Sequence, residues 1–105
     1  MTPISLTLTC KDSTEAEIII QALLAQRLIA CAKTSAVSST FYWHEHVEKA
    51  QEVLITMESV LEKFAEIESV VKSLHSYETF VLQAYPILKA SVGVQAWIAE
   101  AVKNS

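Results

Sequence analysis

The sequence predicts one α+β domain whose elements follow the order β-α-β-β-α-β, with an additional helix at the C-terminal end. Three observations indicate this class. Apolar and polar residues alternate at the start of the chain, two later stretches repeat apolar residues at helical spacing, and the region between them is rich in Ser, Thr, Val and aromatic residues. With 105 residues the chain has room for one hydrophobic core, so we expect a single domain over 1–105.

The first two elements are a strand and a helix. Residues 4–10 alternate apolar and polar side chains, which is the period of a half-buried strand. Asp12 followed by Glu15 resembles a capping box with Asp in the place of Ser or Thr. We therefore expect a helix that runs to about Leu28. The predicted buried face of this helix carries Ala16, Ile19, Ile20, Leu23 and Leu24.

A long strand and its partner should follow. Residues 30–47 contain neither Pro nor Gly and are rich in strand-forming residues, so we expect one long strand. Residues 52–58 form its predicted antiparallel partner. Ser59 with Glu62 makes a second capping box, which predicts the start of the second helix. Its apolar residues step by four, three, four and three: Val60, Phe64, Ile67, Val71 and Leu74.

The last part of the chain predicts a strand and a short helix. Thr79 to Ile87 reads as a strand that ends near Pro86, and Gly93 precedes the final helix. The whole order is the ferredoxin-like split βαβ arrangement, in which two helices cover one face of an antiparallel sheet. The other face must also be covered, and the surplus of apolar residues suggests that neighbouring subunits cover it.

Composition excludes several classes of protein. Apolar residues make up 51% of the chain and charged residues 19%, more apolar surface than so small a domain can bury, so we expect an obligate oligomer. The net charge of −4 and the single arginine, Arg27, leave no basic stripe for nucleic acid. No apolar run approaches a membrane span, and residues 1–4 lack the features of a signal peptide. Cys10 and Cys31 form no disulfide framework, so we expect reduced thiols and a cytoplasmic location.

Little in the sequence supports catalysis. Cys10 precedes a predicted helix N-terminus, whose dipole could lower a thiol pKa, but a cysteine at a strand end is more often a small buried apolar residue. The acidic pairs read as solvated faces, and one glycine cannot make a phosphate-binding loop. An acyl-phosphate hydrolase on this fold would need such a loop and an arginine after the first strand. We therefore expect no enzymatic activity.

Histidines offer two possible metal sites. His44 and His46 are two apart on the predicted strand, so both should point to one face, where Glu48 or another subunit would complete the ligands of Cu or Zn. The alternative is a polar hairpin end without a ligand. His75 follows the second helix, where it can cap the helix or line a pocket with Tyr77 and Glu78.

Five motifs in register resemble one family. The chain resembles the CutA family of divalent-cation tolerance proteins in Thr9-Cys10-Lys11-Asp12, Arg27-Leu28-Ile29-Ala30-Cys31, Tyr42-Trp43 leading to Glu52-Val53-Leu54, Leu74-His75-Ser76-Tyr77-Glu78, and Ala96-Trp97-Ile98. The resemblance implies a ferredoxin-like protomer in a tight homotrimer, similar in architecture to the nitrogen-regulatory PII signalling proteins. It also implies a role in tolerance of divalent cations, copper in particular, and in some members an anchoring function.

The resemblance also implies site residues. Metal binding in some members uses adjacent histidines and an N-terminal cysteine, which maps onto His75 and Cys10, while the first histidine is Leu74 here. Clefts between subunits would bind the ion, Cu²⁺ or another divalent cation, or a small effector, with lateral pockets near Trp43, Tyr77 and Glu78. The alternative is a trimeric scaffold without a ligand of its own, and any protein partner stays open. The hairpin turn, where the family usually has glycine, holds Glu45, which implies another turn geometry or strain.

Overall fold

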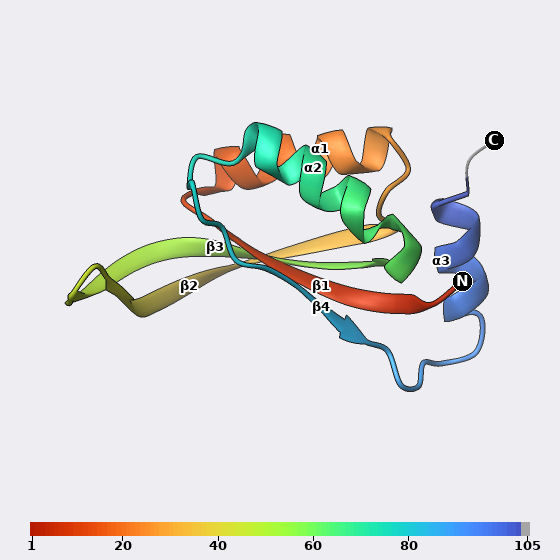
Figure 1. Ribbon diagram of the computed structural model, residues 1–105. Helices are drawn as coiled ribbons and strands as arrows, with labels where there is room; N and C mark the ends of the chain where they lie inside the picture. The colour runs from red at the N-terminus through yellow and green to blue at the C-terminus, as the bar shows by residue number, and fades with distance from the viewer. Residues whose placement is uncertain (104–105) are drawn as a thin grey trace.

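The computed structural model describes residues 1–103 and confirms the predicted α+β class and element order. The elements are β1 (Pro3–Cys10), α1 (Ser13–Ala25), β2 (Cys31–Trp43), β3 (His46–Val60), a 3₁₀ turn (Leu61–Lys63), α2 (Phe64–Leu74), β4 (Leu82–Pro86) and α3 (Val94–Ala101). The strands form one antiparallel sheet in the order β2-β3-β1-β4. Helices α1 and α2 cover one face of it, while α3 packs at the end of the sheet near the N-terminus (Figure 1).

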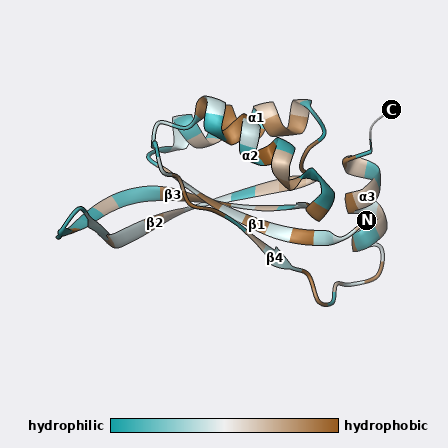
Figure 2. Ribbon diagram, in the orientation of Figure 1, coloured by the Kyte–Doolittle hydropathy of each residue, from teal (hydrophilic) through white to brown (hydrophobic). Residues whose placement is uncertain are grey.

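Strand register places the core between the sheet and the two helices. On β1 the residues Ile4, Leu6, Leu8 and Cys10 are buried, and the residues between them are partly exposed. Leu6 pairs with Met57 and Leu8 with Ile55, all four completely buried. Figure 2 shows the same alternation along β1, where hydrophobic positions follow paler ones. A two-residue period with one buried face produces this pattern.

The β2–β3 hairpin extends far beyond the rest of the sheet and forms an arm, which we define as residues 36–53 (Figure 1). Strand β1 ends where Cys10 pairs with Val53, whereas the hairpin continues to the pair Trp43 and His46. The predicted long strand and its antiparallel partner are confirmed, but their bounds are wrong: β2 ends at Trp43 instead of Val47, and the partner strand begins at His46 instead of Glu52. His44 lies in the turn in the left-handed region, with φ 54°. Glycine and asparagine adopt this conformation most readily, and the turn contains neither, so the sequence did not indicate it.

Helix α1 begins as predicted and ends early. The Asp12 carboxylate accepts a hydrogen bond from the Glu15 N–H at 2.9 Å, as a capping residue does. The helix stops at Ala25 instead of near Leu28, because Arg27 takes φ 54° and closes the end with two backbone bonds of the Schellman type. The predicted buried face is confirmed for four residues, while Leu24 is 39% exposed.

The prediction that Ser59 and Glu62 form a capping box is wrong. Ser59 lies at the end of β3, completely buried, and its Oγ donates to the Leu28 carbonyl at 2.5 Å. The Glu62 carboxylate accepts from the Thr2 N–H and hydroxyl, both at 3.0 Å. Helix α2 begins only at Phe64, after the 3₁₀ turn. Ser59 thus ties the end of β3 to the loop after α1, and Glu62 ties the 3₁₀ turn to the residue before β1.

In the C-terminal part of the chain, β4 is shorter than predicted, whereas α3 begins where predicted. Strand β4 begins at Leu82, so residues 79–81 belong to the preceding loop. Gly93, with φ 90°, directly precedes α3 as expected. Helix α3 makes a second small core, whose buried members are Val60, Ile98 and Val102. Within residues 1–103, every helix is too short or too polar to cross a bilayer.

Candidate functional site

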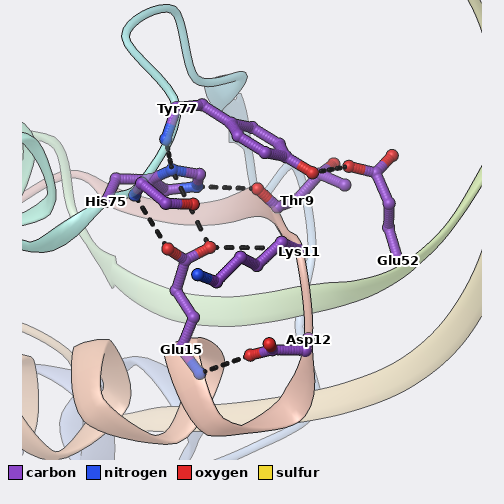
Figure 3. Close-up of polar contacts among 8 residues, drawn as sticks. Thr9, Lys11, Asp12, Glu15, Glu52, His75 and Tyr77 are labelled. Atoms are coloured by element: carbon purple, nitrogen blue, oxygen red, sulfur yellow. Dashed lines mark hydrogen bonds and ion pairs between the residues drawn. The ribbon is translucent and has the colours of Figure 1, made fainter.

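Cys10, Glu15 and His75 meet where β1 ends and α1 begins, and we call these three residues the cluster. The ligand atoms of Cys10, Glu15 and His75 all lie within 4.8 Å of one another. Cys10 is the last residue of β1, Glu15 lies in the first turn of α1, and His75 directly follows α2. The two predicted metal residues, 65 positions apart in the sequence, are therefore neighbours, and the structure adds the Glu15 carboxylate to them. Figure 3 shows Glu15 and His75 facing each other.

Glu15 joins the start of α1 to the loop after α2. Its carboxylate accepts hydrogen bonds from the Lys11 N–H at 3.0 Å and from the Ser76 N–H at 2.8 Å (Figure 3). One of its oxygens is 3.9 Å from the His75 Nδ1. Burial raises the pKa of the Glu15 carboxyl, but the bonds from Ser76 and Lys11 outweigh it, so the pKa is lowered overall. The sequence analysis assigned Glu15 to capping alone and missed its place in the cluster.

His75 is buried with both ring nitrogens bonded. Nε2 is 2.9 Å from the Thr9 carbonyl oxygen, and Nδ1 is 3.0 Å from the Tyr77 backbone nitrogen. The side chain has no exposed area, and the ring stacks on Phe80 with 5.3 Å between centroids. His75 directly follows the end of α2, where its backbone N–H bonds to the Val71 carbonyl at 2.8 Å, but its ring nitrogens bond Thr9 and Tyr77 instead of capping the helix.

Cys10 is completely buried beside negative groups. Burial first, and then the charges of Glu15, Asp12 and Glu52, raise the pKa of the Cys10 thiol to about 12. This shift favours the protonated thiol. Of the two roles considered for Cys10, the burial of its side chain favours the buried apolar residue.

The predicted pocket residues lie apart within one chain. Tyr77 is next to the cluster, and its hydroxyl donates to Glu52 Oε2 at 2.6 Å (Figure 3). Burial and this carboxylate raise the pKa of the Tyr77 phenol. Glu78 is exposed in the same loop. Trp43 ends β2 at the far end of the arm, seven residues beyond the level of Cys10, or roughly 23 Å along the strand.

His44 and His46 do not share one face of a strand, so the predicted geometry of that site is wrong. His44 lies in the turn and His46 opens β3. The ring of His44 contacts Trp43 edge-on, with 4.8 Å between centroids. Among residues 1–103, a group of three close His, Cys, Asp or Glu donors occurs at the cluster and nowhere else.

Two shallow hollows of the described surface bear on the site. One, of about 290 Å³, opens over the start of α1 and is lined by Lys11, Asp12, Thr14, Glu15, Ile18, Leu74 and Ser76. Glu15 is the one member of the cluster in this lining. The other, of about 340 Å³, lies between α3 and the ends of β1 and β3, and its lining has no His, Cys, Asp or Glu. The smaller hollow is therefore the one with ligand chemistry.

The cluster fits a divalent ion in the kind and number of its donors. A thiolate, an imidazole and a carboxylate suit Zn or Cu, and three protein ligands leave a position for water or a fourth group. Ligands of one such ion lie roughly 3–4 Å apart, so donors spread over 4.8 Å need only small side-chain movements. The ion must displace the thiol proton and one hydrogen bond of His75.

Comparison with known proteins gives consistent matches. Residues 4–101 match the family described as CutA1 divalent ion tolerance protein. The divalent-cation tolerance protein CutA of Archaeoglobus fulgidus is 35% identical over 96 residues, which cover 91% of this chain and 94% of that protein. A CutA homolog of Xenopus laevis is 26% identical over 95 residues; the match covers 90% of this chain but only 63% of the frog protein.

Solved structures agree with these matches. The structure of the Archaeoglobus fulgidus protein, described as a periplasmic divalent cation tolerance protein, has a TM-score of 0.93 at 34% identity and covers 96% of this chain and 99% of that one. CutA1 from Oryza sativa has a TM-score of 0.94 at 18% identity, with 100% and 97% coverage. At that identity the rice protein shows a common fold alone.

Proposed function

This chain belongs to the CutA1 divalent ion tolerance family, and from this premise we propose that it takes part in the response to divalent cations by binding a metal ion at the cluster. The observation that carries the proposal is the meeting of the Cys10, Glu15 and His75 donor atoms within 4.8 Å. The Glu15 carboxylate is held in its ionised form by two backbone N–H groups, which places a negative charge beside the thiol and the imidazole. Copper is the preferred ion of the proposal, since thiolate and imidazole ligands suit it.

We propose that the protein works as a homotrimer. The chain measures 44 × 27 × 20 Å and has a radius of gyration of 14.4 Å, above the roughly 13 Å of a compact domain of this length, because the arm leaves the body. An arm without a helix over it has few contacts of its own and is stabilised by a neighbour. The exposed apolar residues that support this are Tyr42, Trp43, Val47, Leu88 and Val92.

In this trimer the arm of one protomer would reach the cluster of the next. Trp43 is too far from Tyr77 within one chain, so a pocket that contains Trp43, Tyr77 and Glu78 needs two chains. Such a pocket would lie over the cluster and hold the ion or a small effector. We further propose a protein without enzymatic activity and a cytoplasmic location, which the two free cysteines support.

Metal titration tests the proposal. Metal-free protein is titrated with Cu²⁺ and with Zn²⁺ by calorimetry, in parallel with Cys10→Ser and His75→Gln. We expect wild-type binding tighter than about 100 µM and at least a tenfold loss in each variant. The matched control is the double variant His44→Gln and His46→Gln, which removes exposed imidazoles of the arm and leaves the cluster intact. Binding that depends on the arm histidines and not on Cys10 contradicts the proposal.

Native mass spectrometry tests the assembly. We expect a mass three times that of the 11.6 kDa chain, with bound ions reported in the same spectrum. Trp43→Ala should weaken the trimer, whereas Tyr85→Ala, which removes an aromatic residue from β4, serves as a comparison for lost apolar surface. A wild-type spectrum of monomer alone rules out the shared pocket.

A scaffold without a ligand is the second candidate. Within residues 1–103, each buried side-chain nitrogen and oxygen already has a hydrogen-bond partner, so the cluster is complete as a structural joint. This reading predicts that Cys10→Ser changes neither cation binding nor the trimer. Purification of complexes through a tagged copy, with wild type and Trp43→Ala compared, would then identify a partner of the arm.

A further inference from the structure

Two hydrogen bonds fix the orientation of the His75 ring and the roles of its nitrogens. Because the Thr9 carbonyl oxygen can only accept, Nε2 donates to it at 2.9 Å. Nδ1 accepts the Tyr77 N–H at 3.0 Å. The side chain has no exposed area. The His75 ring therefore fastens the loop after α2 to the end of β1.

An ion on this ring removes the acceptor of the Tyr77 N–H, whichever nitrogen it binds. On Nδ1 the ion takes the same lone pair. On Nε2 the ion displaces the proton, and the neutral ring then carries that proton on Nδ1, facing the Tyr77 N–H and the Glu15 oxygen 3.9 Å away. In both cases the Cys10 thiol proton passes to solvent as the sulfur binds the ion. Metal binding and the His75–Tyr77 bond therefore exclude each other.

Tyr77 links this bond to the arm. Its ring lies 5.0 Å from the His75 ring, and its hydroxyl donates to Glu52 at 2.6 Å. Glu52 is 8% exposed on β3, next to Val53, which pairs with Cys10 where β1 ends. A short bond to a buried carboxylate is among the stronger hydrogen bonds in proteins. Tyr77 thus holds the base of the arm to the loop that carries His75.

We infer that a metal ion and the Tyr77 N–H compete for His75, so that ion binding loosens the loop through which the Tyr77 hydroxyl holds Glu52 at the base of the arm. The inference rests on the proposed function, because it requires an ion at the cluster. It adds a consequence of binding: the occupancy of a buried site changes the contacts of β3, whose residues 46–53 belong to the arm. Since the competition is reciprocal, the Tyr77–Glu52 bond must weaken metal binding.

The test measures both sides of the competition with Zn²⁺ as the probe. Hydrogen exchange of the Tyr77 amide is followed by NMR in metal-free and Zn²⁺-loaded protein, and Zn²⁺ affinity is measured for Tyr77→Phe. That variant removes the hydroxyl and keeps the backbone N–H. Tyr85→Phe is the matched control, because the Tyr85 hydroxyl donates to exposed Gln83 on β4, away from the cluster.

We expect the Tyr77 amide to exchange at least tenfold faster with Zn²⁺ bound, since it loses its acceptor. We expect Tyr77→Phe to bind Zn²⁺ about tenfold more tightly than wild type and Tyr85→Phe to bind equally. Cys10-dependent Zn²⁺ binding with unchanged Tyr77 exchange and unchanged affinity in Tyr77→Phe would overturn the competition and leave the proposed function standing. Zn²⁺ binding that is absent, or equal in Cys10→Ser, would overturn both.

Discussion

Removing the Glu15 carboxylate should destabilise the protein well beyond the loss of an ordinary helix residue. Glu15→Ala leaves the Lys11 and Ser76 N–H groups without their acceptor. A buried donor left unpaired costs about 1–3 kcal/mol, which gives about 2–6 kcal/mol for two. The 290 Å³ hollow borders Glu15, so water can reach part of the vacated space, and we expect a loss at the lower end of this range, about 2–3 kcal/mol. Glu15→Gln keeps one acceptor oxygen and should lose about half as much.

Urea unfolding at one fixed chain concentration measures these losses, since an oligomer has a stability that depends on concentration. The matched control is Glu17→Ala, two positions along the same helix, whose exposed carboxylate accepts from the Gln21 side chain at 2.8 Å. It should change the free energy of unfolding by less than about 0.5 kcal/mol. If Glu15→Ala also stays within about 0.5 kcal/mol of wild type, the two N–H groups do not depend on Glu15 and our account of the joint is wrong.

Three further predictions concern the same framework. Folding lowers the pKa of Glu15 from 4.5, so the ionised carboxylate stabilises the protein above pH 4.5, and this stabilisation is lost as the pH falls through the folded pKa. Urea unfolding across that range should show that Glu15→Gln loses less unfolding free energy on acidification than wild type. His44→Asn should increase the free energy of unfolding by about 0.5–1 kcal/mol and so raise the thermal midpoint, because asparagine tolerates φ 54° better. A lowered midpoint would contradict strain at this turn. Ser59→Ala should cost about 1–2 kcal/mol in chemical unfolding, whereas Ser73→Ala, which removes an exposed hydroxyl bond to Val70, should cost less than about 0.5; equal losses would contradict the buried role of Ser59.

Periodicity predicted the fold well because the core depends on it. The alternation over 4–10 and the helical spacing of the buried residues of α1 set which faces meet, and a shift by one residue would expose them. The errors fall where a single residue decides the course of the backbone. His44 and Arg27 adopt left-handed conformations without being glycine, so neither the turn after Trp43 nor the early end of α1 was visible in the sequence. Ser59 shows the converse, since its spacing to Glu62 fits a cap that tertiary contacts override.

Only two residues of the candidate site were predicted, and the prediction came from the family resemblance. No spacing rule indicates that Cys10 and His75, which are 65 positions apart, lie close together. The role of Glu15 in the site was missed because helix capping already explains its three-residue spacing from Asp12. In the structure its N–H serves the cap, while its carboxylate turns to the loop after α2. One residue therefore satisfies a local rule and a tertiary one, and a sequence pattern reports only the first.

Glu15 is the residue that the proposed metal site adds to the ligands implied by the family resemblance. Leu74, which stands where the resemblance implies a histidine, lines the same hollow as Glu15. A carboxylate is a harder ligand than an imidazole, so of the three donors Glu15 contributes least to the copper preference of the proposal. Glu15→His should therefore shift the preference of the site toward copper, measured as the ratio of Cu²⁺ to Zn²⁺ affinities. A ratio that stays constant while both ions still depend on Cys10 would show that Glu15 shapes the loop and does not touch the ion.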